Sequence, residues 1–147
     1  MVFEALTVFC TALFSGAAVY ITFVEHPARL ACGTAVALSQ WRPSYKRAAF
    51  MQAPLASLGF LCGVAAYIRG SGPVPLIAGV LLGALVPFTV FIILPTNKQL
   101  LDPDRDPSSD QTAHLLRRWG HLHAIRTAVS LLALLMLVVS MLIGRTG

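Results

Sequence analysis

The sequence predicts an all-α protein, an integral membrane four-helix bundle that forms a single domain over residues 1–147. Hydrophobic residues make up 56% of the chain and charged residues 12%, whereas soluble domains carry roughly a quarter charged residues. The charged residues also leave four long gaps, over residues 5–24, 48–68, 70–97 and 127–144. Each gap is long enough for a helix to cross a hydrocarbon layer of about 30 Å. No alternation of polar and apolar residues favours a β-barrel, the other fold that satisfies its backbone in lipid.

The first predicted span covers roughly residues 4–25. It begins with Met-Val-Phe-Glu and lacks the basic start of a cleaved signal peptide, so we expect it to remain as a helix of the mature protein. The small residues at 15–18 favour the close approach of a neighbouring helix and are compatible with a homo-oligomer. Because Pro27 disfavours the α conformation at the residue before it, we expect the helix to end at about His26.

The second and third spans are predicted over roughly 46–68 and 74–94. Pro54 and Pro87 fall inside them and are expected to bend the helices. The segment 28–41 is mostly small, apolar and too short to cross the membrane, so we expect it at the interface or packed over the bundle. The sequence shows no internal repeat that we can define.

The fourth span is predicted over roughly 122–144. Ser108 followed by Gln111 resembles a capping box and predicts a helix start at the end of a polar loop. An amphipathic pattern then leads into the span, so we expect one unbroken helix of about 35 residues, or roughly 50 Å.

The basic residues predict how the bundle sits in the membrane. Four spans place both termini and the turn after the second span on one side, where only Arg69 and Arg145 are found. All other basic residues lie on the opposite side: Arg29, Arg42, Lys46, Arg47, Lys98, Arg105, Arg117, Arg118 and Arg126. By the positive-inside rule that side is cytoplasmic and both termini are on the non-cytoplasmic side. The formal charge of +5 therefore needs no nucleic-acid partner, and we expect an integral protein of the cytoplasmic (inner) membrane with the lipid bilayer as its partner.

Side chains capable of chemistry gather at the predicted cytoplasmic ends of the spans. They are Glu25, His26 and Arg29 after the first, Tyr45 and Gln52 near the start of the second, Asn97 after the third, and Trp119, His123 and Arg126 near the start of the fourth. Taken singly, such residues have ordinary explanations as helix ends, an aromatic belt or partners of lipid headgroups.

Helical spacing singles out the last group. Trp119, His123 and Arg126 share one helix face because they are four and three positions apart. An unpaired cation at the edge of an apolar span is costly, so Arg126 should point inward to a partner such as Glu25 or reach the headgroups. Among the histidines we favour His123 first and His26 second. Two histidines and a carboxylate from separate helices form a metal site or an acid–base site, and no HExxH, GxSxG or P-loop motif decides between them.

At these residues the sequence resembles the anthrone oxygenase-like family of small four-span membrane proteins. The resemblance covers essentially the whole chain and lies in four segments in the expected order: Glu25-His26-Pro27, Trp41-x-x-x-Tyr45-x-Arg47 leading to Gln52, Leu94-Pro95-Thr96-Asn97-Lys98, and Trp119-x-x-x-His123-x-x-Arg126. Lys98 stands where the family often has an Asn. Members with an assigned role oxidise anthrones to anthraquinones with O₂.

The resemblance implies a membrane-embedded oxygenase with a polar pocket on the cytoplasmic side and a flat, lipophilic, anthrone-like substrate. Loss of a proton from the activated CH₂ of an anthrone gives an electron-rich anthrolate, which passes an electron to O₂ unaided or at a metal. His123 or Glu25 would take this proton. The residues implied in catalysis are His123, Glu25, His26 and Asn97. Those implied in substrate binding are Arg126, Trp119, Tyr45, Gln52 and Arg29, of which the aromatic rings would stack on the substrate.

The cofactor is left open by the sequence. If a metal is used, the implied ligands are His26, His123 and Glu25, and copper or iron suits O₂ chemistry better than zinc. Chemistry with O₂ and no cofactor stands beside this. Two other functions compete: a redox subunit that binds haem, a metal or a quinone between histidines of opposing helices, and a non-catalytic membrane interaction protein.

Overall fold

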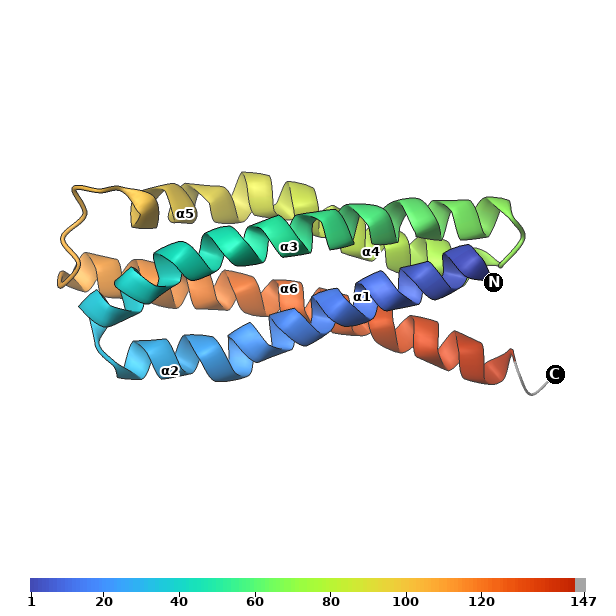
Figure 1. Ribbon diagram of the computed structural model, residues 1–147, viewed down its shortest axis with the longest axis horizontal. Helices are drawn as coiled ribbons and strands as arrows, with labels where there is room; N and C mark the ends of the chain where they lie inside the picture. The colour runs from blue at the N-terminus through green and yellow to red at the C-terminus, as the bar shows by residue number, and fades with distance from the viewer. Residues whose placement is uncertain (145–147) are drawn as a thin grey trace.

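The computed structural model describes residues 1–144, and this part of the chain is helical with no β-strand (Figure 1). In chain order the elements are α1 (Val2–Tyr20), the π-helix η1 (Ile21–Glu25), α2 (His26–Ala31), α3 (Thr34–Ile68), α4 (Pro73–Phe88), the π-helix η2 (Thr89–Ile93), α5 (Leu94–Leu101) and α6 (Asp110–Ile143). Because α1, η1 and α2 follow one another without a break, as do α4, η2 and α5, they form four long helical stretches.

Each of the four stretches is long and apolar enough to cross a membrane: Val2–Ala31, Thr34–Ile68, Pro73–Leu101 and Asp110–Ile143. The predicted fold class, an all-α membrane four-helix bundle, is therefore confirmed, and the predicted spans lie within these stretches apart from the last residue of the fourth. Both described ends of the chain and the turn between α3 and α4 lie at one end of the bundle (Figure 1). The turn after α2 and the loop before α6 lie at the other end. Which end is cytoplasmic stays a prediction, and Arg145 lies outside the described residues.

The prediction that the first helix ends at His26 is wrong. His26 has helical backbone angles (φ −68°, ψ −44°), and the helical path continues to Ala31. In the preceding π-helix the wider turn lets the N–H of His26 donate to the carbonyl of Ile21. Pro27 then stands in the first turn of α2, where a missing N–H costs little. The change of hydrogen-bond register therefore accommodates the proline that was expected to end the helix.

The same arrangement recurs in the third stretch. There, η2 is followed by α5 with Pro95 in its first turn. Phe23 and Pro27 in the first stretch match Phe91 and Pro95 in the third, and each pair has the same spacing. The first and second stretches form one helical hairpin, and the third and fourth form another. The structure thus shows a correspondence between these two hairpins that the sequence pattern alone did not reveal.

Two expectations about helix starts also change. Segment 28–41 is not a separate interfacial piece, because it contains the end of α2, a turn at Gly33 (φ 88°) and the first turns of α3, which bury Ala37 and Trp41. The cap of α6 is Ser109 rather than Ser108: its Oγ accepts a hydrogen bond from the backbone N–H of Thr112. The expected unbroken helix into the fourth span is confirmed at 34 residues.

Glycine lets α3 and α4 pack closely. A Cβ added at Gly63 would collide with the carbonyl oxygen of Pro75 and lie 3.1 Å from the Cα of Gly79. Gly59, one turn before Gly63 in α3, faces Leu82, and Gly83, one turn after Gly79 in α4, faces Phe60. Small residues at this spacing bring helix backbones together in membranes. Gly16, part of the small-residue segment predicted to contact a neighbour, has open space where its Cβ would lie.

We predict that Gly63→Ala destabilises the protein by about 1–3 kcal/mol, because two helix backbones must separate to admit the methyl group. Gly16→Ala is the matched control and should be neutral or stabilising by about 0.5–1 kcal/mol, since alanine is the better helix former. The free energy of unfolding in a detergent titration measures both. Equal effects of the two substitutions would show that the α3–α4 contact does not depend on Gly63.

We predict that Cys32, which is exposed in the turn after α2, faces the cytoplasm. A membrane-impermeant maleimide should leave Cys32 unlabelled in sealed right-side-out vesicles and label it once they are opened. In a Cys32→Ala protein carrying Ser71→Cys, the new thiol in the turn between α3 and α4 should be labelled at once. The Cys32→Ala protein alone gives the background, and the reverse labelling pattern would invert the orientation.

Candidate active site

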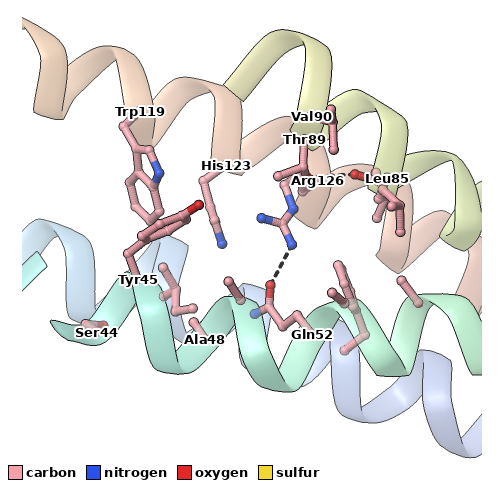
Figure 2. Close-up of a pocket in the computed structure, with 16 residues that line it drawn as sticks. Ser44, Tyr45, Ala48, Gln52, Leu85, Thr89, Val90, Trp119, His123 and Arg126 are labelled. Carbon is pink, nitrogen blue, oxygen red and sulfur yellow. Dashed lines mark hydrogen bonds between the residues drawn. The ribbon is translucent and has the colours of Figure 1, made fainter. Parts of the chain in front are cut away.

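A cavity of about 140 Å³ lies inside the bundle, with a wall formed by residues of α1, η1, α3, α4, η2 and α6. Five of the predicted site residues line it (Figure 2): Tyr45, Gln52, Trp119, His123 and Arg126. Most of the remaining wall is apolar, with alanines from α3 and side chains such as Leu85 and Val90 opposite them. The cavity is therefore a mainly apolar space with a few polar groups directed into it, as is common for binding sites of small molecules.

His123 is the most enclosed ionisable group of this wall, with 2% of its surface exposed. Its ring stacks on Trp119, with centroids 4.9 Å apart and an angle of 29° between the planes. Nδ1 lies 3.0 Å from the hydroxyl of Thr22 in η1. Nε2 has no hydrogen-bond partner among residues 1–144, and the ring extends into the cavity (Figure 2). One ring nitrogen is thus held by the protein while the other is available to a bound molecule.

Arg126 lies one turn beyond His123 on α6 and points inward, as its position at the edge of an apolar span predicted. Its partner is not Glu25: Nη2 donates to Oε1 of Gln52 at 2.7 Å, and the guanidinium carbon lies 5.4 Å from the centre of the Phe14 ring. The Nε of Arg126 and the Nε2 of Gln52 are buried and have no partner among the described residues. These two groups therefore present unused N–H donors beside the cavity.

Aromatic rings line the cavity at its end nearer the turn after α2 and the loop before α6. Tyr45 stacks on Trp41 with centroids 4.9 Å apart and planes 5° from parallel. The rings of Trp41 and Trp119 meet edge to face with centroids 5.7 Å apart, and the ring of Trp119 also stacks on that of His123. The stack joins α3 to α6 and fixes the orientation of His123.

Glu25 and Arg29 form an ion pair of 2.6 Å, one helical turn apart, away from this cavity. The same Oε1 of Glu25 also accepts hydrogen bonds of 2.7 Å from Gln40 and from Ser44 of α3. Glu25 lines a separate groove between the first stretch and α3. Arg29 is 5% exposed and lies 5.9 Å from the centre of the Trp119 ring, so the pair connects the first stretch to the aromatic stack.

His26 lies behind Trp119 and does not line the cavity either. Its Nε2 is 3.1 Å from the carbonyl oxygen of Leu116, to which it donates, and its ring centroid is 5.0 Å from that of Trp119. The ring fits against α6 because residue 120 is glycine: a Cβ there would lie 2.6 Å from His26 Nε2. His26 and Thr22 line a second cavity, of about 240 Å³, and His123 belongs to the walls of both.

Asn97 is fully buried, but it is not part of the cavity wall. It stands on α5 between Ile93 and Leu100, which pack with the two tryptophans. Neither atom of its side-chain amide has a partner among the described residues. The structure therefore places Asn97 beside the aromatic cluster and outside the wall of the cavity at His123.

The expected metal ligands do not come together. No group of three His, Cys, Asp or Glu side chains suited to hold a metal ion exists in the part of the chain that the structure describes. Glu25 is engaged by Arg29, Gln40 and Ser44 in its own groove, and one nitrogen of each histidine is committed to a bond within the protein. His26, His123 and Glu25 therefore do not fit a three-ligand copper or iron site.

Sequence reasoning missed the hydroxyl groups around His123. Thr22 contacts both the histidine ring and the hydroxyl of Thr127, at 3.0 and 2.7 Å. Helical spacing could have pointed to Thr127, which is one turn after His123, and to the pair Glu25 and Arg29. Thr22 is likewise four residues before His26, but its contact with His123 depends on how the first stretch packs against α6, which no local pattern shows.

Comparison with known proteins supports the resemblance seen in the sequence. The family model described as anthrone oxygenase matches residues 41–136, which is more than half of the chain. The matched range includes the residues of α3, η2 and α6 that form most of the cavity wall. No match is found among curated proteins or among solved structures. The extent of the family match shows that the chain belongs to the anthrone oxygenase family.

Proposed function

We propose that this protein is a membrane-embedded oxygenase that uses O₂ to convert the CH₂ of a flat, lipophilic, anthrone-like substrate into a carbonyl group. Family membership supports the class of reaction. The single structural observation that carries the proposal is His123, a buried imidazole with one nitrogen held by Thr22 and the other free at an apolar cavity.

The cavity suits a lipophilic molecule that arrives through the membrane. Ala53 of α3 and Val90 of η2 belong to its wall and are also exposed on the outer surface of the bundle. Such a position lets a substrate enter sideways from lipid between α3 and the third stretch. A dry cavity of about 150 Å³ holds benzene. A three-ring substrate would therefore fill the cavity of about 140 Å³ and extend into this opening.

The proposed chemistry needs only O₂ as oxidant. His123 Nε2 takes a proton from the CH₂ group, and the resulting carbanion bonds to O₂ with transfer of its electrons to oxygen. The peroxide anion takes the proton back to give a hydroperoxide. Removal of the remaining C–H proton then forms the C=O bond as the O–O bond breaks, and hydroxide leaves and is protonated to water. One O₂ is consumed, one oxygen atom enters the product and one water is released.

Charge that develops on the substrate oxygen would be stabilised by Arg126 and Gln52. Both groups have unused N–H donors at the cavity, and no carboxylate among residues 1–144 pairs with Arg126. Hydrogen-bond donors placed where charge develops are commonly the largest contribution to catalysis. Trp119 and Tyr45 would stack on the flat rings of the substrate.

The remaining predicted site residues are assigned supporting roles. Glu25, Arg29, His26 and Asn97 lie outside the cavity wall, so we propose that they position the site rather than touch the substrate. Glu25 and Arg29 hold the first stretch against α3 and Trp119. The site then lies at the cytoplasmic side of the inner membrane, as the distribution of basic residues suggests.

We predict that His123→Gln lowers kcat for oxidation of the hydroxylated anthrone dithranol by about 10²–10⁴-fold, the usual contribution of a general base. O₂ uptake by purified protein in lipid nanodiscs, corrected for autoxidation without protein, measures this. His114→Gln on the exposed face of α6 is the control and should leave the rate unchanged. Full activity of His123→Gln would remove His123 as the base. Lack of O₂ uptake by the unmodified protein with any anthrone would favour the redox-subunit or interaction functions.

We also predict that Arg126→Gln lowers kcat by about 10²–10³-fold, because the developing negative charge loses its cationic partner. Arg118→Gln, which removes an exposed arginine from the same helix, should leave kcat within about twofold, since an exposed charge is screened by solvent. A loss in KM alone, with kcat unchanged, would show that Arg126 binds the substrate without stabilising the charge that develops in the reaction.

A further inference from the structure

We propose that Thr22 is a positioning residue that sets which nitrogen of His123 carries the proton. In this assignment Nδ1 is protonated and donates to Thr22, which leaves the lone pair of Nε2 facing the cavity. The catalytic consequence rests on the proposed function, whereas the protonation pattern is measurable without it.

The direction of the hydroxyl chain supports this assignment. Thr127 has one hydroxyl proton, and its oxygen lies 3.2 Å from the carbonyl oxygens of Ala18 and of His123. Carbonyls only accept, so a proton donated to either leaves Thr127 Oγ1 as the acceptor in the 2.7 Å contact with Thr22. The proton of Thr22 is then used, and its oxygen accepts from His123 Nδ1 at 3.0 Å. If Thr127 donates to one of these carbonyls, the hydrogen-bond network thus favours the tautomer in which Nε2 is a base.

The π-helix η1 places Thr22 for this task. Residues four apart drift by about 40° around a regular α-helix, and the wider turn of a π-helix offsets that drift. Thr22 and His26 consequently face α6 together and line the second cavity with Gly120 and His123. The carbonyl of Ala18, just before η1, is the one that Thr127 contacts. The irregular turn and the hydroxyl chain therefore belong to one local arrangement.

A neutral partner at Nδ1 has a chemical consequence. Within the described part of the chain, the charged groups that interact with His123 are Arg126 on its own helix and Arg29 on α2, with His26 also close, and no carboxylate is among them. Thr22 therefore fixes the ring without placing a negative charge beside it. The same bond direction holds after Nε2 has taken a proton, because Nδ1 donates in both states and the chain need not rearrange.

Nitrogen NMR of isotope-labelled histidine in nanodiscs tests the assignment directly, with the His123→Gln spectrum used to identify the signal. We expect the Nδ1–H tautomer in the unmodified protein and in Thr22→Ser, which keeps the hydroxyl. We expect Thr22→Val to lose this preference. Thr127→Val should reverse it toward Nε2–H, because the Thr22 proton would then turn to Nδ1. An Nε2–H signal in the unmodified protein would overturn the proposal. So would a tautomer that changes in neither valine variant.

Kinetics with dithranol provide the second measurement. Thr22→Val should lower kcat about tenfold or more with little change in KM, and Thr22→Ser should restore the rate, because substrate binding does not involve Thr22. A fall in kcat that Thr22→Ser does not restore would contradict the positioning role. If the unmodified protein oxidises no anthrone, the proposed function fails, while the NMR result still decides the role of Thr22. If Thr22→Val does not fold, Thr127→Val carries both measurements.

Discussion

The structure depends on one constraint: a bundle that faces lipid on the outside has to satisfy its polar side chains from within. No water is available in the hydrocarbon layer, so an unpaired buried group is costly. The chain meets this constraint in part by pairing side chains from different stretches, such as Gln52 with Arg126 and Thr22 with His123. The buried amide of Asn97, in contrast, has no partner among the described residues. Each pair fixes the relative position of two helices as well as its own geometry. The polar site and the register of the bundle are therefore determined by the same contacts.

The two π-helices show how regular spans are adapted to this need. Each lies in a stretch that starts at the same end of the bundle, and each is followed by a proline in the first turn of the next α-helix. The partner helices then bring Trp41 and Trp119 into edge-to-face contact. One turn after these tryptophans the two hairpins differ, with Tyr45 in the first and His123 in the second. A shared helical frame therefore presents a stacking ring from one half and an ionisable ring from the other.

Much of this arrangement could be predicted from the sequence, and the exceptions have physical reasons. Charge-free segments predict spans because the cost of burying a charge in lipid is large, and the spacing of Trp119, His123 and Arg126 predicts their common face because α6 is a regular helix. The π-helices were not predicted, because a five-residue change from the α-helical to the π-helical hydrogen-bond pattern leaves the apolar character of the segment unchanged. The effect of Pro27 on the residue before it therefore predicts a helix end at about His26, whereas the helical path continues to Ala31. The partner of Arg126 was also not predicted, since pairing between helices depends on their rotation.

The two inward-facing arginines explain where charge is available in this protein. Arg29 is held by the carboxylate of Glu25 at 2.6 Å, so its positive charge is neutralised within the bundle. Arg126 is held by the neutral amide of Gln52 at 2.7 Å, and it is the one Lys or Arg among the described residues of the cavity wall. Its charge is consequently uncompensated in an apolar space, which costs stability unless an anion occupies the cavity. An anthrolate or a peroxide formed beside His123 would supply that anion. Both the unbalanced cation and the free imidazole nitrogen therefore support the proposed reaction, in which a negatively charged intermediate forms beside them.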